Sequence, residues 1–282
     1  MISGNGPTLP PSEVPEYEAR GLHVDLNTID EVAGALDAGA WRPGDGWLAG
    51  GTYLFSEPQP HLRRLRDLTT LGWPSLTETP DGLLIAATCT IAELDRYGPP
   101  LFGRCCDAFL ASFKIQHVAT VGGNLCAALP AGPMTSLTAA LDGSCTVESL
   151  SGERRLVPVV DFVTGDGTTD LRPAEFLRSV FLPASALTAR SAFRRGSLHT
   201  LGRSAALVIG RVDADGTFVL TITASTRRPV QLRFATVPSA AELRARIPED
   251  RWLDDVHGRP AWRRHLTLRY ADEIRDELAA GS

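Results

Sequence analysis

Two glycine-paired loops are the segments of this chain best suited to chemistry. They are residues 48–54 (LAGGTYL) and residues 119–125 (ATVGGNL). Each has an apolar lead-in, two adjacent glycines and a small polar residue. Adjacent glycines allow positive φ and let a ligand approach the backbone N–H groups, which together form an anion-binding nest. Two nests suit a pyrophosphate held from two sides. Tight turns without a ligand are the alternative.

Other candidate motifs are weaker. Residues 165–168 (GDGT) begin like a dinucleotide fingerprint but lack its strand and helix context, so they are interpreted as a loop. The six histidines have no metal-ligand spacing, and no nucleophile elbow is present, so we expect neither a metal site nor a catalytic residue. The basic cluster of Arg194, Arg195 and Arg203 either meets an anionic part of a ligand or lies on a solvated surface.

The composition excludes several classes of protein. Among 282 residues, 28 Lys and Arg against 33 Asp and Glu give a net charge of −5, which disfavours a nucleic-acid binder. No apolar run is long enough for a membrane span, and the N-terminus does not resemble a signal peptide. The five cysteines are irregularly spaced, which favours buried free thiols and a cytoplasmic protein.

Three capping boxes and one apolar stripe predict helices. The boxes pair Thr28 with Glu31, Thr90 with Glu93, and Ser239 with Glu242. The first would open a helix with Ile29, Val32, Ala33 and Leu36 on its apolar face. A long terminal helix over residues 261–280 would carry an apolar stripe, which consists of Trp262, Leu266, Tyr270, Ile274 and Leu278.

Strand signals lie between these helices. Residues 82–88 read as a short buried strand, and two hairpins are predicted over residues 145–160 and 205–224. Helices and hairpins alternate without a regular βαβ rhythm, so the fold class is α+β rather than a doubly wound parallel sheet. We expect a mobile leader over residues 1–21, a first domain over 22–185 and a C-terminal domain over 186–282, because the composition changes near residues 183–190.

Taken together, the loops and their surroundings resemble a known family. AGGT at residues 49–52 and TVGGN at 120–124 are similar to loops of the flavin-binding subunits or domains of the xanthine dehydrogenase and carbon monoxide dehydrogenase family, the molybdenum hydroxylases. TIAEL at 90–94, DFVTG at 161–165, LRPAEFL at 171–177 and SAFR at 191–194 extend the resemblance to about residues 22–280.

The resemblance implies two α+β subdomains that clasp FAD, followed by an α+β C-terminal domain. By the same resemblance, backbone N–H groups of the two loops hold the pyrophosphate, Leu177 packs by the isoalloxazine ring, and Arg194 is a basic residue near the flavin. The implied cofactor-binding residues are Ala49, Gly50, Gly51, Thr52, Tyr53, Leu54, Ala119, Thr120, Gly122, Gly123, Asn124, Leu177 and Arg194.

The function that the resemblance implies is a redox relay. FAD would take electrons from the iron–sulfur clusters of a [2Fe–2S] small subunit, beside a molybdopterin-binding large subunit, and pass them to NAD or another acceptor. A stand-alone FAD-dependent oxidoreductase acting on a small molecule, and a scaffold that has lost FAD, are the alternatives.

Three positions depart from the pattern of the family. Tyr53 and Pro133 stand where the family often has Asp, and Ser204 also replaces an Asp before a strand. Loss of these carboxylates weakens the expected contacts with FAD and leaves the electron acceptor open, but it disturbs neither loop.

Overall fold

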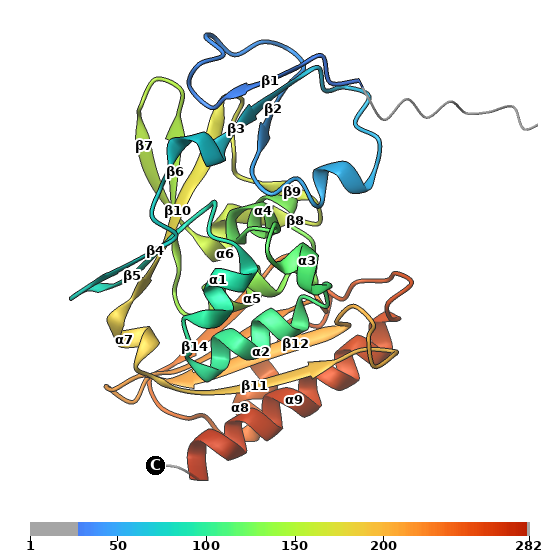
Figure 1. The fold of residues 1–282 in the computed structure, drawn as a ribbon. Coiled ribbons are helices and arrows are strands. Elements are labelled where there is room, and N and C mark those ends of the chain that lie inside the picture. Colours follow the sequence, from blue (N-terminus) through green and yellow to red (C-terminus); the bar gives the residue numbers. More distant parts are fainter. Residues whose placement is uncertain (1–27, 281–282) are drawn as a thin grey trace, which may run out of the picture.

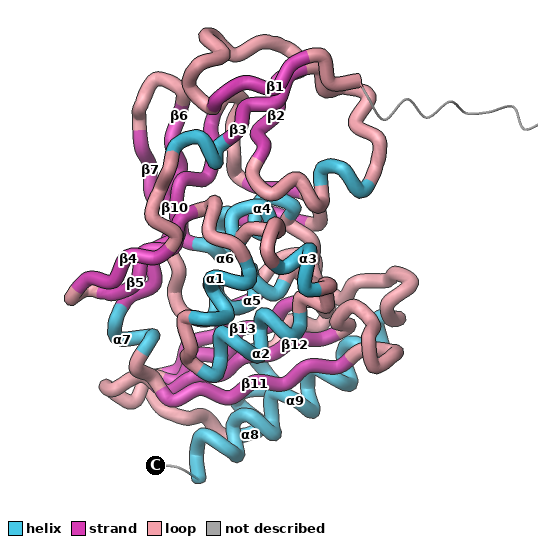
Figure 2. The backbone as a smooth tube through the Cα atoms, viewed as in Figure 1, coloured by secondary structure: helices cyan, strands magenta, loops and turns pink. Residues whose placement is uncertain are grey.

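Three sheets and one small hairpin organise residues 28–280, the part of the chain that this computed structural model describes (Figures 1 and 2). The N-terminal sheet is parallel, in the order β1-β3-β2, and the predicted leader lies outside the described residues. Its strands are β1 (Glu31–Gly34), β2 (Asp45–Leu48) and β3 (Arg64–Asp67). Two short 3₁₀ helices, η1 (Leu54–Ser56) and η2 (Leu68–Leu71), follow β2 and β3.

The first predicted helix is wrong. Residues 31–34 form β1, because the N–H groups of Asp30 and Glu31 bond to the carbonyl of Arg63 and the strand continues in parallel register with β3. The Thr28 hydroxyl donates to Gln59 O at 3.0 Å. Tertiary strand pairing has overridden a weak local helix signal here.

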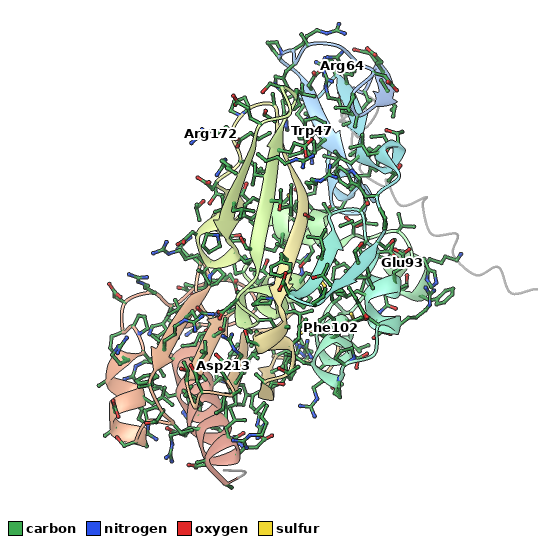
Figure 3. The ribbon with its side chains drawn as sticks, turned by 90° about the vertical axis from the view of Figure 1, so that its left-hand side faces the viewer. Trp47, Arg64, Glu93, Phe102, Arg172 and Asp213 are labelled. Carbon is green, nitrogen blue, oxygen red and sulfur yellow. The ribbon has the colours of Figure 1, made fainter. Side chains whose placement is uncertain are left out.

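A buried ion cluster holds the N-terminal sheet together. Asp45 accepts bonds from Arg64 (Nη2–Oδ2 2.6 Å) and Arg66 (Nε–Oδ2 3.0 Å), and all three side chains are buried. Arg66 also donates to the carbonyls of Gly39 and Ala40, so it fixes the segment that leads into β2. Figure 3 shows Arg64 at this end of the molecule, with Trp47 lower on the same sheet.

The central sheet is antiparallel, in the order β4-β5-β10-β6-β7. Its strands are β4 (Leu76–Thr79), β5 (Gly82–Ala86), β6 (Ser144–Ser149), β7 (Arg154–Pro158) and β10 (Glu175–Pro183). The predicted strand near 82–88 and the first hairpin are confirmed as β5 and as β6 with β7. The predicted loop at 165–168 is the tight connection of a small hairpin, β8 (Val163–Gly165) with β9 (Thr168–Thr169).

Short helices link the central sheet to the rest of the core. They are α1 (Ile91–Arg96), α2 (Pro100–Ala108), α3 (Phe113–Gln116), α4 (Val121–Ala127), α5 (Pro133–Ala140), α6 (Val159–Phe162) and α7 (Ala184–Leu187). The capping box before α1 is confirmed, since the Thr90 hydroxyl accepts from Glu93 N and the Glu93 carboxylate accepts from Thr90 N. The division predicted after residue 185 falls within α7 and stays a prediction.

The C-terminal sheet is antiparallel, in the order β11-β12-β13-β14, and its helices are those predicted. The strands are β11 (Arg190–Gly196), β12 (Ala206–Val212), β13 (Phe218–Thr223) and β14 (Val230–Phe234); the helices are α8 (Ala240–Arg246) and α9 (Pro260–Ala280). Helix α5 packs on β12 and β13 while α9 packs on β11 and β12, so β12 is covered on both sides and almost entirely buried. The α+β prediction is confirmed.

None of the helices between residues 28 and 280 is both long and apolar enough to cross a membrane.

Candidate functional site

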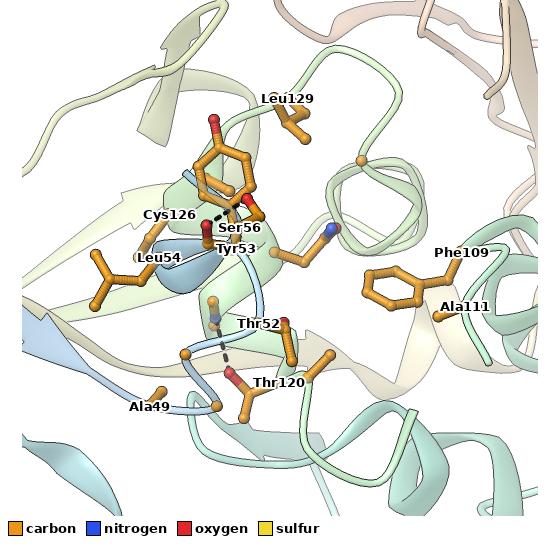
Figure 4. A pocket seen from close by; sticks show the side chains of 18 of the residues that line it. Ala49, Thr52, Tyr53, Leu54, Ser56, Phe109, Ala111, Thr120, Cys126 and Leu129 are labelled. Carbon is orange, nitrogen blue, oxygen red and sulfur yellow. Dashed lines mark hydrogen bonds between the residues drawn. The ribbon is translucent and has the colours of Figure 1, made fainter. Parts of the chain in front are cut away.

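A cavity of about 750 Å³ lies beside both glycine loops (Figure 4). Its wall is built from the loop after β2, the end of α2, the start of α4, the segment before α5, the start of β10 and the connection between β11 and β12. In Figure 1 the N-terminal and C-terminal sheets lie at opposite ends of the molecule, with α3 and α4 between them. The cavity therefore takes residues from β2, from β10 and from the connection between two strands of the C-terminal sheet.

Twelve of the thirteen residues proposed from the sequence line this cavity. They are Ala49, Gly50, Gly51, Thr52, Tyr53, Leu54, Ala119, Thr120, Gly122, Gly123, Asn124 and Leu177. Arg194 is the exception. It lies on β11 and pairs with two carboxylates of α9, Glu273 (2.9 Å) and Glu277 (2.7 Å), and it does not line the cavity.

The first loop lies close to the backbone before the second. A Cβ on Gly50 would lie 1.9 Å from Val118 O, so only glycine permits this approach. Gly51 has φ +70° and its carbonyl accepts from Phe55 N at 2.8 Å. Within residues 28–280, no acceptor is found for the backbone N–H groups of Gly50, Gly51, Thr52 and Tyr53. This loop thus offers the free donors that an anion nest requires.

The second loop does not present the free backbone N–H groups that the sequence predicted. It is the first turn of α4, and its N–H groups are used within the protein: Val121 N donates to Cys89 O, Gly122 N to Ala87 O, Gly123 N to Thr120 Oγ1 and Asn124 N to Thr120 O. It is therefore a capped helix start rather than a set of bare donors. The donors that it still presents are side-chain groups.

Those side-chain donors belong to Thr120 and Asn124. The Thr120 oxygen accepts from Gly123 N at 3.0 Å, which leaves its hydroxyl proton for another acceptor. The Asn124 Oδ1 accepts from Met134 N at 3.0 Å, and in the described part of the chain its NH₂ group has no acceptor. Both residues line the cavity, so one loop offers backbone donors and the other side-chain donors.

One end of the cavity is aromatic and apolar. Trp47 and Phe176 lie with ring centroids 4.8 Å apart and their planes tilted by 60°, and Leu68 packs with them. Sequence reasoning missed Trp47 and Phe176, although each is a near neighbour of a predicted residue. Leu177 is almost fully buried, because it lies on the central strand β10.

The residues that depart from the pattern of the family all line the cavity. The Tyr53 side chain is 48% exposed and Pro133 is buried at the first turn of α5. Ser204 is buried, and its oxygen accepts from Arg195 Nε at 2.8 Å. The cavity also holds Phe109 and Ser112, which carry no sequence signal, and Gly167 of the loop at 165–168, which donates its N–H to Ala128 O.

The described wall of the cavity carries a single charged side chain. No Asp or Glu is found among the described residues that line the cavity, and Arg203 is their one charged side chain. Cys126 also lines the wall, and burial raises the pKa of its thiol to about 12, so it is neutral near pH 7. Among the described residues of the wall, no pair of side chains is suited to general acid–base catalysis.

Fold and cavity together define an α+β protein with a cavity beside two glycine loops, and Arg203 is the one charged side chain of the described wall. Comparison with known proteins identifies that class. The family model for the FAD binding domain in molybdopterin dehydrogenase matches residues 24–185. The chain belongs to this family of oxidoreductase components, and FAD is its cofactor.

Curated relatives agree with the family assignment over part of their length. The chain is 28% identical over 163 residues to a xanthine dehydrogenase FAD-binding subunit of Escherichia coli O157:H7, which covers 54% of this chain and 55% of the relative. It is 30% identical over 116 residues to xanthine dehydrogenase of Oryza sativa subsp. japonica, which covers 36% of this chain and 8% of that protein.

Solved structures show the same fold at low identity. A chain of quinoline 2-oxidoreductase from Pseudomonas putida 86 matches 90% of this chain and 97% of its own length, with a TM-score of 0.72 at 20% identity. A chain of carbon monoxide dehydrogenase from Hydrogenophaga pseudoflava matches 89% and 97%, with a TM-score of 0.73 at 17% identity.

Proposed function

We propose that the cavity beside the two glycine loops is the FAD site, and that the chain is the flavin-carrying electron-transfer component of a molybdenum hydroxylase-type complex. The observation that carries the proposal is the meeting of both loops in one wall. The close approach of Gly50 to Val118 O brings the two loops together, and twelve residues proposed from the sequence line the cavity.

The donor set fits FAD. Free N–H groups of residues 50–53 suit the pyrophosphate oxygens, with the Thr120 hydroxyl and the Asn124 amide as further donors. A volume of about 750 Å³ is within the range for cofactor pockets. The Trp47–Phe176 end, on the side of the N-terminal sheet, suits the adenine ring. No carboxylate of the described wall opposes the two negative charges of the pyrophosphate.

Bound FAD supplies the redox chemistry, and the residues of the chain bind and orient it. Because this wall has no acid–base pair to activate a substrate, a relay is favoured over direct oxidation of a small molecule. The electrons would come from a [2Fe–2S] partner beside a molybdopterin-binding subunit and go to NAD or another acceptor. Five unpaired cysteines suit a reducing cytoplasm for this assembly.

The first test is the absorbance spectrum of the purified chain from 300 to 600 nm, followed by release and identification of the chromophore. We expect a flavin spectrum and released FAD. The variant Gly123→Val is the matched test of the site, because a Cβ on Gly123 meets only the Thr120 hydroxyl oxygen, at 2.9 Å, and otherwise enters open space. A folded Gly123→Val chain with normal flavin content would contradict the site.

The relay is tested separately, with the FAD-loaded chain reduced chemically in the absence of oxygen. Mixing it with NAD⁺, with a quinone and with oxygen in turn identifies the acceptor by the rate of flavin reoxidation. We expect no reduction of the bound flavin by purines or aldehydes added to the chain alone. Rapid reduction by such a substrate would instead favour a stand-alone oxidoreductase.

A further inference from the structure

We propose that Arg203, and not Arg194, is the cation that faces the bound flavin ring and stabilises negative charge on it. This inference rests on the assignment of the cavity to FAD. Arg203 lies in the connection between β11 and β12, lines the cavity and has no partner among the described residues. It is also the one charged side chain of the described wall, so no carboxylate of that wall offsets its charge.

The position of Arg203 is fixed from both sides. The Arg195 guanidinium donates to the carbonyl of Gly202, the residue before it, and to the hydroxyl oxygen of Ser204, the residue after it, at 2.8 Å. Gly202 N also donates to His199 O at 2.8 Å. The backbone at Arg203 is therefore anchored, while its own guanidinium is left free. Arg195 acts as a positioning residue.

Arg194 has the opposite arrangement. Its guanidinium is bound by Glu273 and Glu277 on the outer face of α9, so two carboxylates offset its single charge. It is adjacent to Arg195 in β11, but alternate residues of a strand point to opposite faces. Arg194, the basic residue that the resemblance places near the flavin, thus joins β11 to α9.

We place Arg203 at the flavin ring rather than at the pyrophosphate, because other donors are available to the phosphate oxygens. Neutral backbone and side-chain donors at residues 50–53, 120 and 124 are available to the phosphate oxygens. Arg203 comes instead from the edge of the C-terminal sheet, and Figure 1 shows this sheet at the end of the molecule opposite the N-terminal sheet that carries the first loop. A lone cation beside the ring favours the reduced, anionic form because charges attract strongly where water is excluded.

The experiment measures two properties of the FAD-loaded chain: the affinity for sulfite and the reduction potential of the flavin. Sulfite donates its electron pair to N5 of the oxidised ring, an N–S bond forms, and negative charge appears on the ring. Arg203→Gln should raise the Kd for sulfite about tenfold, as expected for loss of one nearby charge. It should also make the potential more negative. Arg203→Lys should restore most of both effects, and Arg195→Gln should change both in the same direction by less.

Arg251→Gln is the matched control, since Arg251 is an exposed arginine that does not line the cavity. Unchanged sulfite affinity and potential in Arg203→Gln would overturn the proposal. Weaker FAD binding with an unchanged potential would also overturn it, because the charge would then serve the pyrophosphate. An effect in Arg194→Gln that Arg203→Gln lacks would return the role to Arg194. Failure of the parent chain to bind FAD would refute the site itself.

Discussion

Gly122 donates its backbone N–H to the carbonyl of Ala87 at 2.9 Å, and a Cβ on Gly122 would lie 2.5 Å from the Ala87 Cβ. This contact joins the first turn of α4 to the segment that follows β5. The adjacent glycine has a different environment, because a Cβ on Gly123 meets only the Thr120 hydroxyl oxygen. Two neighbouring glycines of one motif therefore have different physical reasons to be glycine.

This difference predicts opposite outcomes for two alanine substitutions. Gly122→Ala should destabilise the chain by about 2 kcal/mol or more, because the Cβ collides with backbone that cannot move freely. Gly123→Ala should stay close to the parent in stability but bind FAD less tightly. Urea unfolding and FAD titration measure the two effects. Equal losses of stability in both variants would contradict the distinction.

Thr120 should matter through its hydroxyl oxygen. Thr120→Ala removes the cap on Gly123 N, and N-cap losses cost about 1 kcal/mol. The same change removes a donor that we assign to the pyrophosphate, so the Kd for FAD should also rise. Thr120→Ser keeps the oxygen and should recover both. If Thr120→Ser behaved like Thr120→Ala in urea unfolding, the methyl group rather than the cap would be responsible.

Asp142 connects the loop after α5 to the C-terminal sheet. It accepts bonds from Arg211, Arg233 and Gln231, and Arg211 is buried and also donates to Ala140 O. Burial alone would raise the pKa of Asp142, but bonds from Arg233 and Arg211 hold it below its usual value. Figure 3 shows Asp213, the second carboxylate on Arg211, in the C-terminal part of the molecule.

Asp142→Asn should therefore cost about 2 kcal/mol of stability, since it leaves buried Arg211 with less compensation. Asp276→Asn is the control, because the Asp276 side chain is 64% exposed and its pairing with Arg275 should contribute little. Urea unfolding at neutral pH compares the two variants. Similar stabilities for both would show that Asp213 alone compensates Arg211.

Local signals in the sequence were the reliable ones. The capping box at Thr90 and the two long hairpins formed as predicted, because each depends on residues close together in the chain. The helix predicted near residue 31 failed because the β3 partner lies 33 residues further on, at Arg64, and its hydrogen bonds outweigh a local preference. No local pattern could report that pairing.

The sequence predicted many residues that line the cavity, but it did not show which of their N–H groups are free. The glycine loops identified one wall of the cavity, yet the sequence could not show that the N–H groups of residues 121–124 are already bonded. It also could not show which of Arg194 and Arg203 has a free guanidinium, because both are arginines near β11. Only the carboxylates of Glu273 and Glu277, about 80 residues away in sequence, decide which one is free.

The pair of Glu175 and Arg155 should make the stability of the central sheet depend on pH. Arg155 donates to both carboxylate oxygens of Glu175 (3.0 and 2.7 Å), and these bonds hold the pKa of Glu175 below its usual value. A lowered pKa means that the pair stabilises the fold above the pKa of the unfolded chain, about 4.3. That stabilisation is lost as the pH falls through the lower, folded-state pKa.

Glu175→Gln should thus lower the free energy of unfolding by about 1 kcal/mol at pH 7 and by progressively less toward pH 3. The measurement is urea unfolding at both pH values, with Glu153→Gln as the control, because Glu153 is exposed in the turn between β6 and β7. Glu175 directly precedes Phe176 and Leu177 in the cavity wall, so FAD affinity should weaken along with stability. A loss of stability that was the same at pH 3 and pH 7 would show that packing, rather than the ion pair, holds the start of β10.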